Sequence, residues 1–186
     1  AQKSGLTIQW GRDQAAAFYD VYKINIGRLG TPVHSRKFFE EAVRRMEDAA
    51  DVLTVRYQDT VIAGMLVVDF GKVSADPFAS SLPAYKALNP NMLMYWEALR
   101  MACEKGAEFF DFGRSHRDSG TYRFKRQWGA QSYPLDYRTF KNGVPEGPSS
   151  TSYYRSQPAR LASRIWRHLP GGLQGVLGSA VRKWMP

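Results

Sequence analysis

The sequence holds a single cysteine, Cys103, and this scarcity excludes an intrachain disulfide or a zinc site built on cysteines. The three histidines, His34, His116 and His168, lie far apart and form no metal-ligand pattern, so we expect no metal. Long apolar runs are also missing. The run over residues 61–70 is about half of the ~20 residues that a membrane-spanning helix needs.

The start of the chain has no apolar core of the kind that signal peptides carry. We therefore expect a soluble or peripheral protein in the cytoplasm. The first residue is Ala1 rather than methionine, which suggests a piece of a longer protein. Hydrophobic residues make up 44% and charged residues 23% of the 186 residues, which is typical of a globular domain with a substantial core.

Acidic residues are absent after Glu146. The formal net charge of the whole chain is +9. Six basic residues follow this position and supply six of those nine charges: Arg155, Arg160, Arg164, Arg167, Arg182 and Lys183. The sequence thus predicts a nearly balanced domain over residues 1–146 and a basic tail over residues 147–186.

Two segments of the tail, residues 159–169 and 173–184, carry apolar side chains at helical spacing. One interpretation is a helical hairpin packed on the domain. Another is a peripheral membrane contact through residues 155–186, because a basic face opposite a Trp/Leu face suits an anionic lipid surface. A third is RNA binding.

The remaining patterns predict two helices, a three-strand meander, and then helix, strand, helix and strand. Asp13 and Ser35 are expected to cap the first two helices, and Asn89 or Asn91 the third. The expected elements are helices over 13–29, 36–46, 91–106 and 120–129, strands over 51–59, 60–70, 72–82 (bent near Pro77), 107–113 and 132–140, and a linker over 142–152. This order predicts an α/β fold with a mixed central sheet and fits the GNAT (acyl-CoA N-acyltransferase) fold.

The stretch FDFGRS ends a predicted strand, where an open α/β sheet usually places its ligand crevice. It brings Asp111, Arg114 and Ser115 to that edge. Arg114 has the geometry to clamp a phosphate or carboxylate, and Gly113 allows a sharp turn. The alternative is a structural salt bridge between Asp111 and Arg114.

Basic and aromatic residues alternate in the next predicted helix, SGTYRFKRQWG. Lys125 follows the helix start, where anions are favoured, and is a candidate to bind a phosphate or a developing oxyanion. The alternative is a basic helix face with core aromatic residues behind it.

The combination of LGTPV, YWE, FDFGRS and GTY-FK--WG resembles the FemAB-related proteins, and most of all those of exosortase/PEP-CTERM gene clusters. The resemblance covers about residues 10–140 and implies the C-terminal lobe of a two-lobe, GNAT-type protein. It also implies a transferase that moves an acyl or aminoacyl group onto an amine of an envelope or exopolysaccharide precursor.

Site residues follow from the same resemblance. Lys125 matches a lysine that lies near the acceptor site in FemAB relatives, and Arg114 and Tyr122 belong to the same matched block. Tyr95 and Trp96 stand in the YWE motif, and we expect them to bind substrate together with Ser115. Independently of the resemblance, the reaction needs a base to take up the proton of the amine, and Asp111 is the expected base, with Glu97 as an alternative.

Acetyl-CoA-binding members of this fold carry a glycine-rich turn before the long helix, and its backbone N–H groups hold the pyrophosphate. Here that stretch reads AYKALNPN, without glycine. A pyrophosphate still has the helix start near Asn91 as a contact. We expect acyl-CoA or aminoacyl-tRNA as co-substrate, with no permanently bound cofactor, and the missing glycines favour a donor other than acetyl-CoA or an acceptor-binding role.

Cys103 is expected to pack in the core, and His116 is a polar-loop residue with no visible partner. The expected partners are an anionic small-molecule or lipid-linked precursor, aminoacyl-tRNA, and the inner face of the membrane, and a homo-oligomer stays open. The rival hypotheses are a non-catalytic acceptor-binding lobe and an RNA-binding module.

Overall fold

The computed structural model describes residues 4–135, 138–141 and 143–148, and six residues of the tail, namely Arg164, Trp166, Arg167, Leu177, Gly178 and Val181. The strands are β1 (Leu6–Trp10), β2 (Ala50–Tyr57), β3 (Thr60–Phe70), β4 (Val73–Ser81), β5 (Phe109–Asp111), β6 (Arg138–Lys141) and β7 (Val144–Pro148). The helices are α1 (Ala15–Leu29), α2 (Arg36–Met46), α3 (Pro90–Glu104) and α4 (Gly120–Gln127), and the 3-10 helices are η2 (Arg12–Gln14), η3 (Glu47–Ala49) and η4 (Pro83–Leu88).

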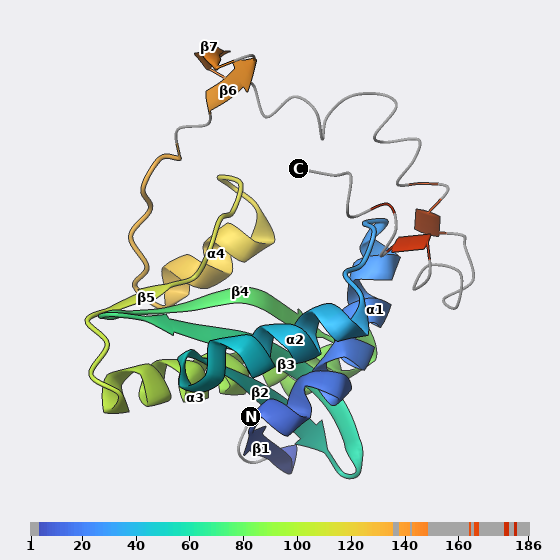
Figure 1. Ribbon diagram of the computed structural model, residues 1–186. Coiled ribbons are helices and arrows are strands. Elements are labelled where there is room, and N and C mark those ends of the chain that lie inside the picture. The colour runs from blue at the N-terminus through green and yellow to red at the C-terminus, as the bar shows by residue number, and fades with distance from the viewer. Residues whose placement is uncertain are drawn as a thin grey trace.

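Strands β1 to β5 form one mixed sheet in chain order (Figure 1). Neighbouring strands are antiparallel except β4 and β5, which are parallel and joined by a crossover through α3. The sheet and its flanking helices confirm the predicted α/β class with a mixed central sheet. Strand β1 was not predicted, although Ile8 and Trp10 alternate with more exposed residues, as in a half-buried strand.

The expected last strand over 132–140 was wrong in extent, and it does not belong to the central sheet. Strand β6 begins at Arg138 and pairs with β7 in a separate two-stranded sheet. Strand β7 lies within the expected linker. The cause is local, because Asn142-Gly143 between the two strands is a strong signal for a two-residue hairpin turn, and Gly143 adopts a positive φ of 79°.

The two faces of the sheet bury different helices. Along β2, Leu53 and Val55 face the cluster that contains Met94 of α3, and Val52 faces the cluster that contains Phe39 of α2. This alternation follows from the two-residue period of a strand. Helices α1 and α2 therefore cover one face and α3 the other, while α4 follows β5 at the far edge (Figure 1).

The predicted N-cap residues can be compared with the observed helix starts. Ser35 caps α2 as predicted, since its hydroxyl accepts from the backbone N–H of Phe38 at 3.1 Å. The cap at Asp13 was wrong, because this residue lies inside η2 and α1 starts at Ala15. Asn89 precedes α3 in the left-handed region (φ 53°), and its side chain makes no capping bond.

Strands β4 and β5 stay paired for three residues only, from Val73 opposite Phe109 to Ala75 opposite Asp111. On its other side, β4 loses register with β3, since Ala75 pairs with Val68 but Phe78 pairs with Leu66. The irregularity falls at Asp76 and Pro77, where the sequence predicted a bend. Asp76 therefore lies at the point where β4 separates from β5.

Most of the expected tail helices lie outside the described residues. Two of the described tail residues contact the domain. Arg167 donates to the carbonyl of Leu29 at 3.4 Å. Gly178 is buried so closely that a Cβ on it would lie 2.9 Å from the backbone nitrogen of Val33. Within the described ranges, no helix combines the length and the apolar character needed to cross a bilayer.

Candidate active site

The chain after β5 turns sharply at Gly113, whose φ of 66° is costly for other residues. Asp111 stabilises this turn, because its Oδ1 accepts from the N–H of Gly113 at 2.7 Å. The turn leaves Asp111 and Arg114 exposed and Ser115 partly buried. A short loop then leads into α4.

Helix α4 begins at a serine that the sequence analysis did not single out. The hydroxyl of Ser119 accepts from the N–H of Tyr122 at 3.0 Å. One turn later the half-buried Lys125 reaches back to the turn after β5. Its Nζ donates to the carbonyl oxygens of Gly113 at 3.0 Å and Arg114 at 3.2 Å. The two motifs that the sequence marked as separate candidates are thus held together by one ammonium group.

A cavity of about 1020 Å³ opens over this junction. It is lined by the turn after β5, by α4 and by residues 130–135. Arg114 and Lys125 therefore line the same cavity. The residues from the sequence analysis that line it are Asp111, Gly113, Arg114, Ser115, His116, Tyr122 and Lys125. The contribution that each makes to a reaction stays a prediction.

Three predicted binding residues, all on α3, do not line the cavity. Tyr95 is buried beneath it, where its ring stacks on Phe112 at 5.6 Å between centroids. Trp96 is 53% exposed and Asn91 is also exposed. An α-helix rotates by about 100° per residue, so Tyr95 and Trp96 point in different directions.

Two other residues of α3 also differ from expectation. The expected burial of Cys103 was wrong, because its side chain is exposed. Glu97, the alternative base, forms an ion pair with Arg100 at 2.9 Å on the helix surface and does not line the cavity. Asp111 is therefore the only one of the two candidate bases that lies at the cleft.

Asp76 is a site residue that the sequence analysis missed. It is 7% exposed, it accepts a hydrogen bond from the hydroxyl of Tyr95, and its Oδ1 has no hydrogen-bond partner among the described residues. The signal for it was an aspartate in the middle of a predicted strand, next to the expected bend at Pro77. Asp76 interacts electrostatically with Lys125 of α4, and this proximity depends on the tertiary fold.

The charges of this region are coupled. Burial raises the pKa of Asp76 to about 6, against the lowering effects of the Tyr95 hydrogen bond and the positive charge of Lys125. Burial also lowers the pKa of Lys125, and the negative charges of Asp76 and Asp111 oppose that shift. The pKa of Tyr95 is raised by burial and by Asp76, so its hydroxyl stays a donor at neutral pH.

The turn before α3 does not fit the pyrophosphate of CoA in the manner of the fold family. Three backbone N–H groups in and just after this turn already have acceptors, since Tyr85 donates to the carbonyl of Leu82, Asn89 to that of Lys86 and Met92 to that of Asn89. Pro90 has no N–H, and no residue of this turn lines the cavity. Within the described residues, no cluster of His, Cys, Asp and Glu suited to a metal ion is present.

Comparison with known proteins gives the family. A family model described as an acetyltransferase (GNAT) domain matches residues 2–126. The lipid II:glycine glycyltransferase of Staphylococcus haemolyticus (strain JCSC1435) is 30% identical over 97 residues, which are 48% of this chain and 23% of that protein. The chain thus spans about a quarter of the length of this curated relative.

Solved structures share the fold. FemX superposes with a TM-score of 0.62 at 18% identity, over 69% of this chain and 51% of that one. The aminoglycoside N-acetyltransferase AAC(6′)-Iy, solved in complex with CoA, superposes with a TM-score of 0.60 at 11% identity, over 74% and 95% of the two chains. These identities show the fold alone. The family model covers well over half of the sequence, and the chain therefore belongs to the GNAT acetyltransferase domain family.

Proposed function

We propose that this lobe serves an N-acyl or aminoacyl transferase of the FemAB type, which modifies an amine of an envelope or exopolysaccharide precursor. The observation that carries the proposal is the position of Lys125, half-buried at the cavity and bonded to the carbonyls of Gly113 and Arg114. The likeness to a glycyltransferase and to FemX supports this class of reaction.

The reaction asks little of the protein. An amine nitrogen attacks the carbonyl carbon of an ester or thioester, so that a C–N bond forms and the C–O or C–S bond breaks. The amine gives up a proton to a base, and the leaving oxygen or sulfur takes one up. Asp111 is the base in this proposal, because its carboxylate lies at the cavity.

Lys125 stabilises the oxyanion that forms on the carbonyl oxygen. An ammonium group has three donors, and the two carbonyl acceptors occupy two of them. The third has no hydrogen-bond acceptor within the described part of the chain. A fixed donor of this kind contributes about 10²–10³ in rate when it meets a developing negative charge.

The remaining side chains of the cavity suit an anionic partner. Arg114 provides a guanidinium for a phosphate or carboxylate, and Ser115 and Tyr122 add hydroxyl groups beside it. An anionic or lipid-linked precursor is thus the acceptor we propose. The turn before α3 argues against acyl-CoA bound in the family's manner, and aminoacyl-tRNA is the donor that the FemAB resemblance favours.

The same turn favours one alternative, a non-catalytic lobe that holds the acceptor while another part of a longer protein binds the donor. RNA binding is a third candidate, which the basic residues around the cavity support, and it predicts a tRNA affinity that falls steeply with salt. A peripheral membrane contact through residues 155–186 and a link to a PEP-CTERM system remain parts of the proposal. Liposome flotation with and without residues 155–186 tests the membrane contact.

The decisive experiment is a transfer assay with the full-length protein. Aminoacyl-tRNA and acyl-CoA are offered separately to a lipid-linked, amine-bearing precursor, and the product is followed by mass spectrometry. We expect product with one donor and its loss in Asp111→Asn, with Glu97→Gln as the matched control that keeps activity. No product from either donor would overturn the proposal, and full activity of Lys125→Ala would favour the acceptor-binding lobe.

A further inference from the structure

A buried carboxyl group lies behind the cavity rather than in it. Asp76 sits where β4 separates from β5, and its carbonyl oxygen lies 4.0 Å from the position of a Cβ on Gly113. It therefore backs the turn whose carbonyls hold Lys125. Its side chain is 7% exposed and does not line the cavity, so it is placed to act on Lys125 rather than on a substrate.

We propose that Asp76, held by the hydroxyl of Tyr95, is a positioning residue that keeps the ammonium of Lys125 charged and directed into the cavity. This inference deepens the proposed function and rests on it in one respect, namely that the charge of Lys125 serves to stabilise an oxyanion. The geometry behind it is independent of any substrate.

The need for such a partner comes from the acceptors of Lys125. Both are neutral carbonyl oxygens, so they orient the ammonium without neutralising its charge. Burying an ammonium away from water favours its neutral form unless a negative charge lies nearby. A neutral amine is a weak stabiliser of an oxyanion, so a half-buried lysine in this role needs a carboxylate.

The groups around Asp76 come from three elements. Helix α4 contributes Lys125, β5 contributes Asp111, and α3 contributes the Tyr95 hydroxyl. Asp111 is exposed to solvent, which screens its charge, whereas Asp76 is buried. Tyr95 fixes one carboxylate oxygen of Asp76 and leaves Oδ1, which has no hydrogen-bond partner among the described residues. Of the two carboxylates, Asp76 is the one expected to dominate the charge of Lys125.

The test measures the charge of Lys125 directly and needs no transfer activity. The full chain is labelled with a trace of acetic anhydride at pH values from about 6 to 11, and the labelled fraction of the Lys125 peptide is followed by mass spectrometry. We expect Asp76→Asn to lower the pH at which Lys125 becomes reactive. Near neutral pH its reactivity should rise about three- to tenfold, since one unit in pKa is a tenfold change in neutral amine.

Two further variants keep the result interpretable. Glu108→Gln removes the partner of Lys72 at the surface and should leave the Lys125 profile unchanged. Tyr95→Phe removes the hydrogen bond that favours the charged form of Asp76, so it should move the Lys125 profile in the same direction as Asp76→Asn, but less. It decides the matter if Asp76→Asn does not fold.

An unchanged Lys125 profile in the folded variants would overturn the inference. A shifted profile in a protein that transfers nothing would leave the inference standing and would overturn the proposed function instead. The two failures are therefore distinguishable.

Discussion

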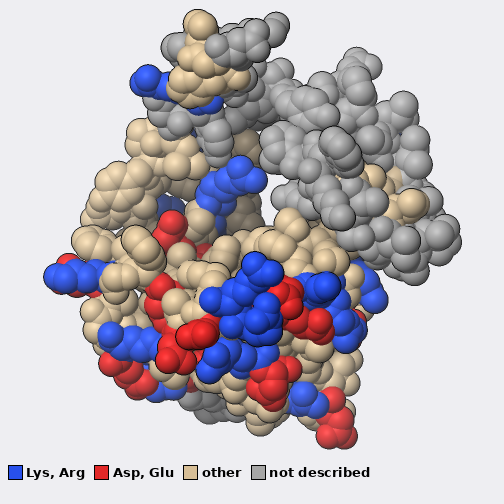
Figure 2. All heavy atoms as spheres, viewed as in Figure 1, with Lys and Arg blue, Asp and Glu red and all other residues tan. Residues whose placement is uncertain are grey.

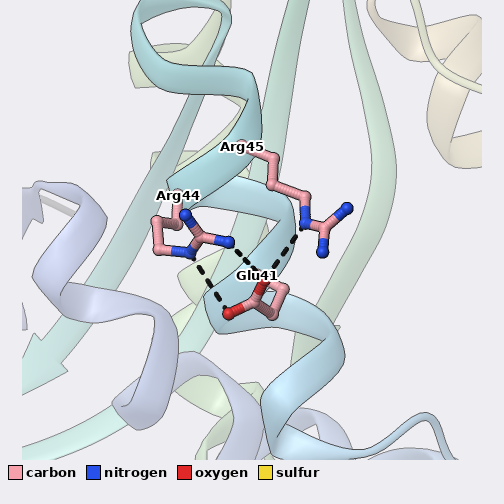
Figure 3. A network of polar contacts seen from close by, with 3 residues as sticks. All are labelled: Glu41, Arg44 and Arg45. Atoms are coloured by element: carbon pink, nitrogen blue, oxygen red, sulfur yellow. Dashed lines mark hydrogen bonds and ion pairs between the residues drawn. The ribbon is translucent and has the colours of Figure 1, made fainter.

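Helices α2 and α4 are both short, both begin at a serine cap and both carry two basic residues near their ends, yet they use those charges differently. In α2, Glu41 pairs with Arg44 at 2.7 Å and with Arg45 at 3.1 Å (Figure 3). Acidic and basic side chains accordingly lie mixed over this face of the molecule (Figure 2).

Helix α4 has no acidic residue, so its cations find other acceptors. Lys125 bonds to the carbonyls of Gly113 and Arg114, and Arg126 bonds to that of Ala130 at 2.8 Å. A carbonyl orients a cation but does not cancel its charge. The same residue types are thus partly neutralised by Glu41 on α2 and keep their full charge on α4.

The largest expected effect separates the two helices by activity. Lys125→Met should reduce the transfer rate by about 10²–10³, because it removes a fixed donor to the developing oxyanion. Arg45→Met, the matched change at the end of α2, should retain activity within about twofold, since surface ion pairs contribute little. Single-turnover rates with the full-length protein measure both. Equal losses in the two variants would mean that the contrast concerns stability rather than chemistry.

The next effect concerns the buried carboxyl group beneath α4. The pKa of Asp76 is raised from 3.8 to about 6 in the folded state, so its ionised form destabilises the fold above pH 6. Asp76→Asn should therefore raise the free energy of unfolding at pH 8 by roughly 1–3 kcal/mol. The gain should shrink as the pH falls through 6 and vanish below 3.8, where the carboxyl group is protonated in both states.

Urea unfolding of the wild type and Asp76→Asn at several pH values tests this sign. The result is most informative beside the labelling of Lys125, because a residue that costs stability and sets the charge of a lysine has a functional reason to be there. A variant that is less stable than the wild type at pH 8 would contradict the prediction.

The two serine caps allow a closer comparison. Ser35→Ala and Ser119→Ala should each cost about 1 kcal/mol of stability, because each removes the side-chain acceptor that caps its helix. Only Ser119→Ala should also slow transfer, since the start of α4 positions Lys125. Thermal melts and transfer rates are measured on the same preparations. Equal rates in both variants would show that the placement of Lys125 does not depend on the cap.

The sequence predicted what depends on local order. Ser35 and the turn at Gly113 follow from patterns within a few residues, and the structure places them as expected. Lys125 was expected to follow the start of its helix, but it lies in the last turn of α4, so the affinity of a helix start for anions does not apply to it. Asp76 could not be found in this way, because its burial depends on the register shift between β3 and β4 and on the return of α4 to β5. The prediction that Trp96 binds substrate at the cavity was wrong for a related reason. Neighbouring residues of a helix point in different directions, and Trp96 faces solvent while Tyr95 is buried.

The smallest expected effect lies in the network of Figure 3. Hydrogen bonds from Arg44 and Arg45 lower the pKa of Glu41 from 4.5 to about 2, so any stabilisation that it provides is present above pH 4.5 and lost as the pH falls through 2. The side chains are exposed to solvent, which screens the pairs, so Glu41→Gln should leave the melting temperature at pH 7 unchanged within error. It should also leave the transfer rate unchanged, because α2 lies on the opposite side of the sheet from α3 and does not line the cavity.

Melting temperatures of the wild type and Glu41→Gln in low and high salt check the stability prediction. A clear loss in melting temperature at low salt that disappears at high salt would show that the stability of α2 depends on its charges more than this comparison allows.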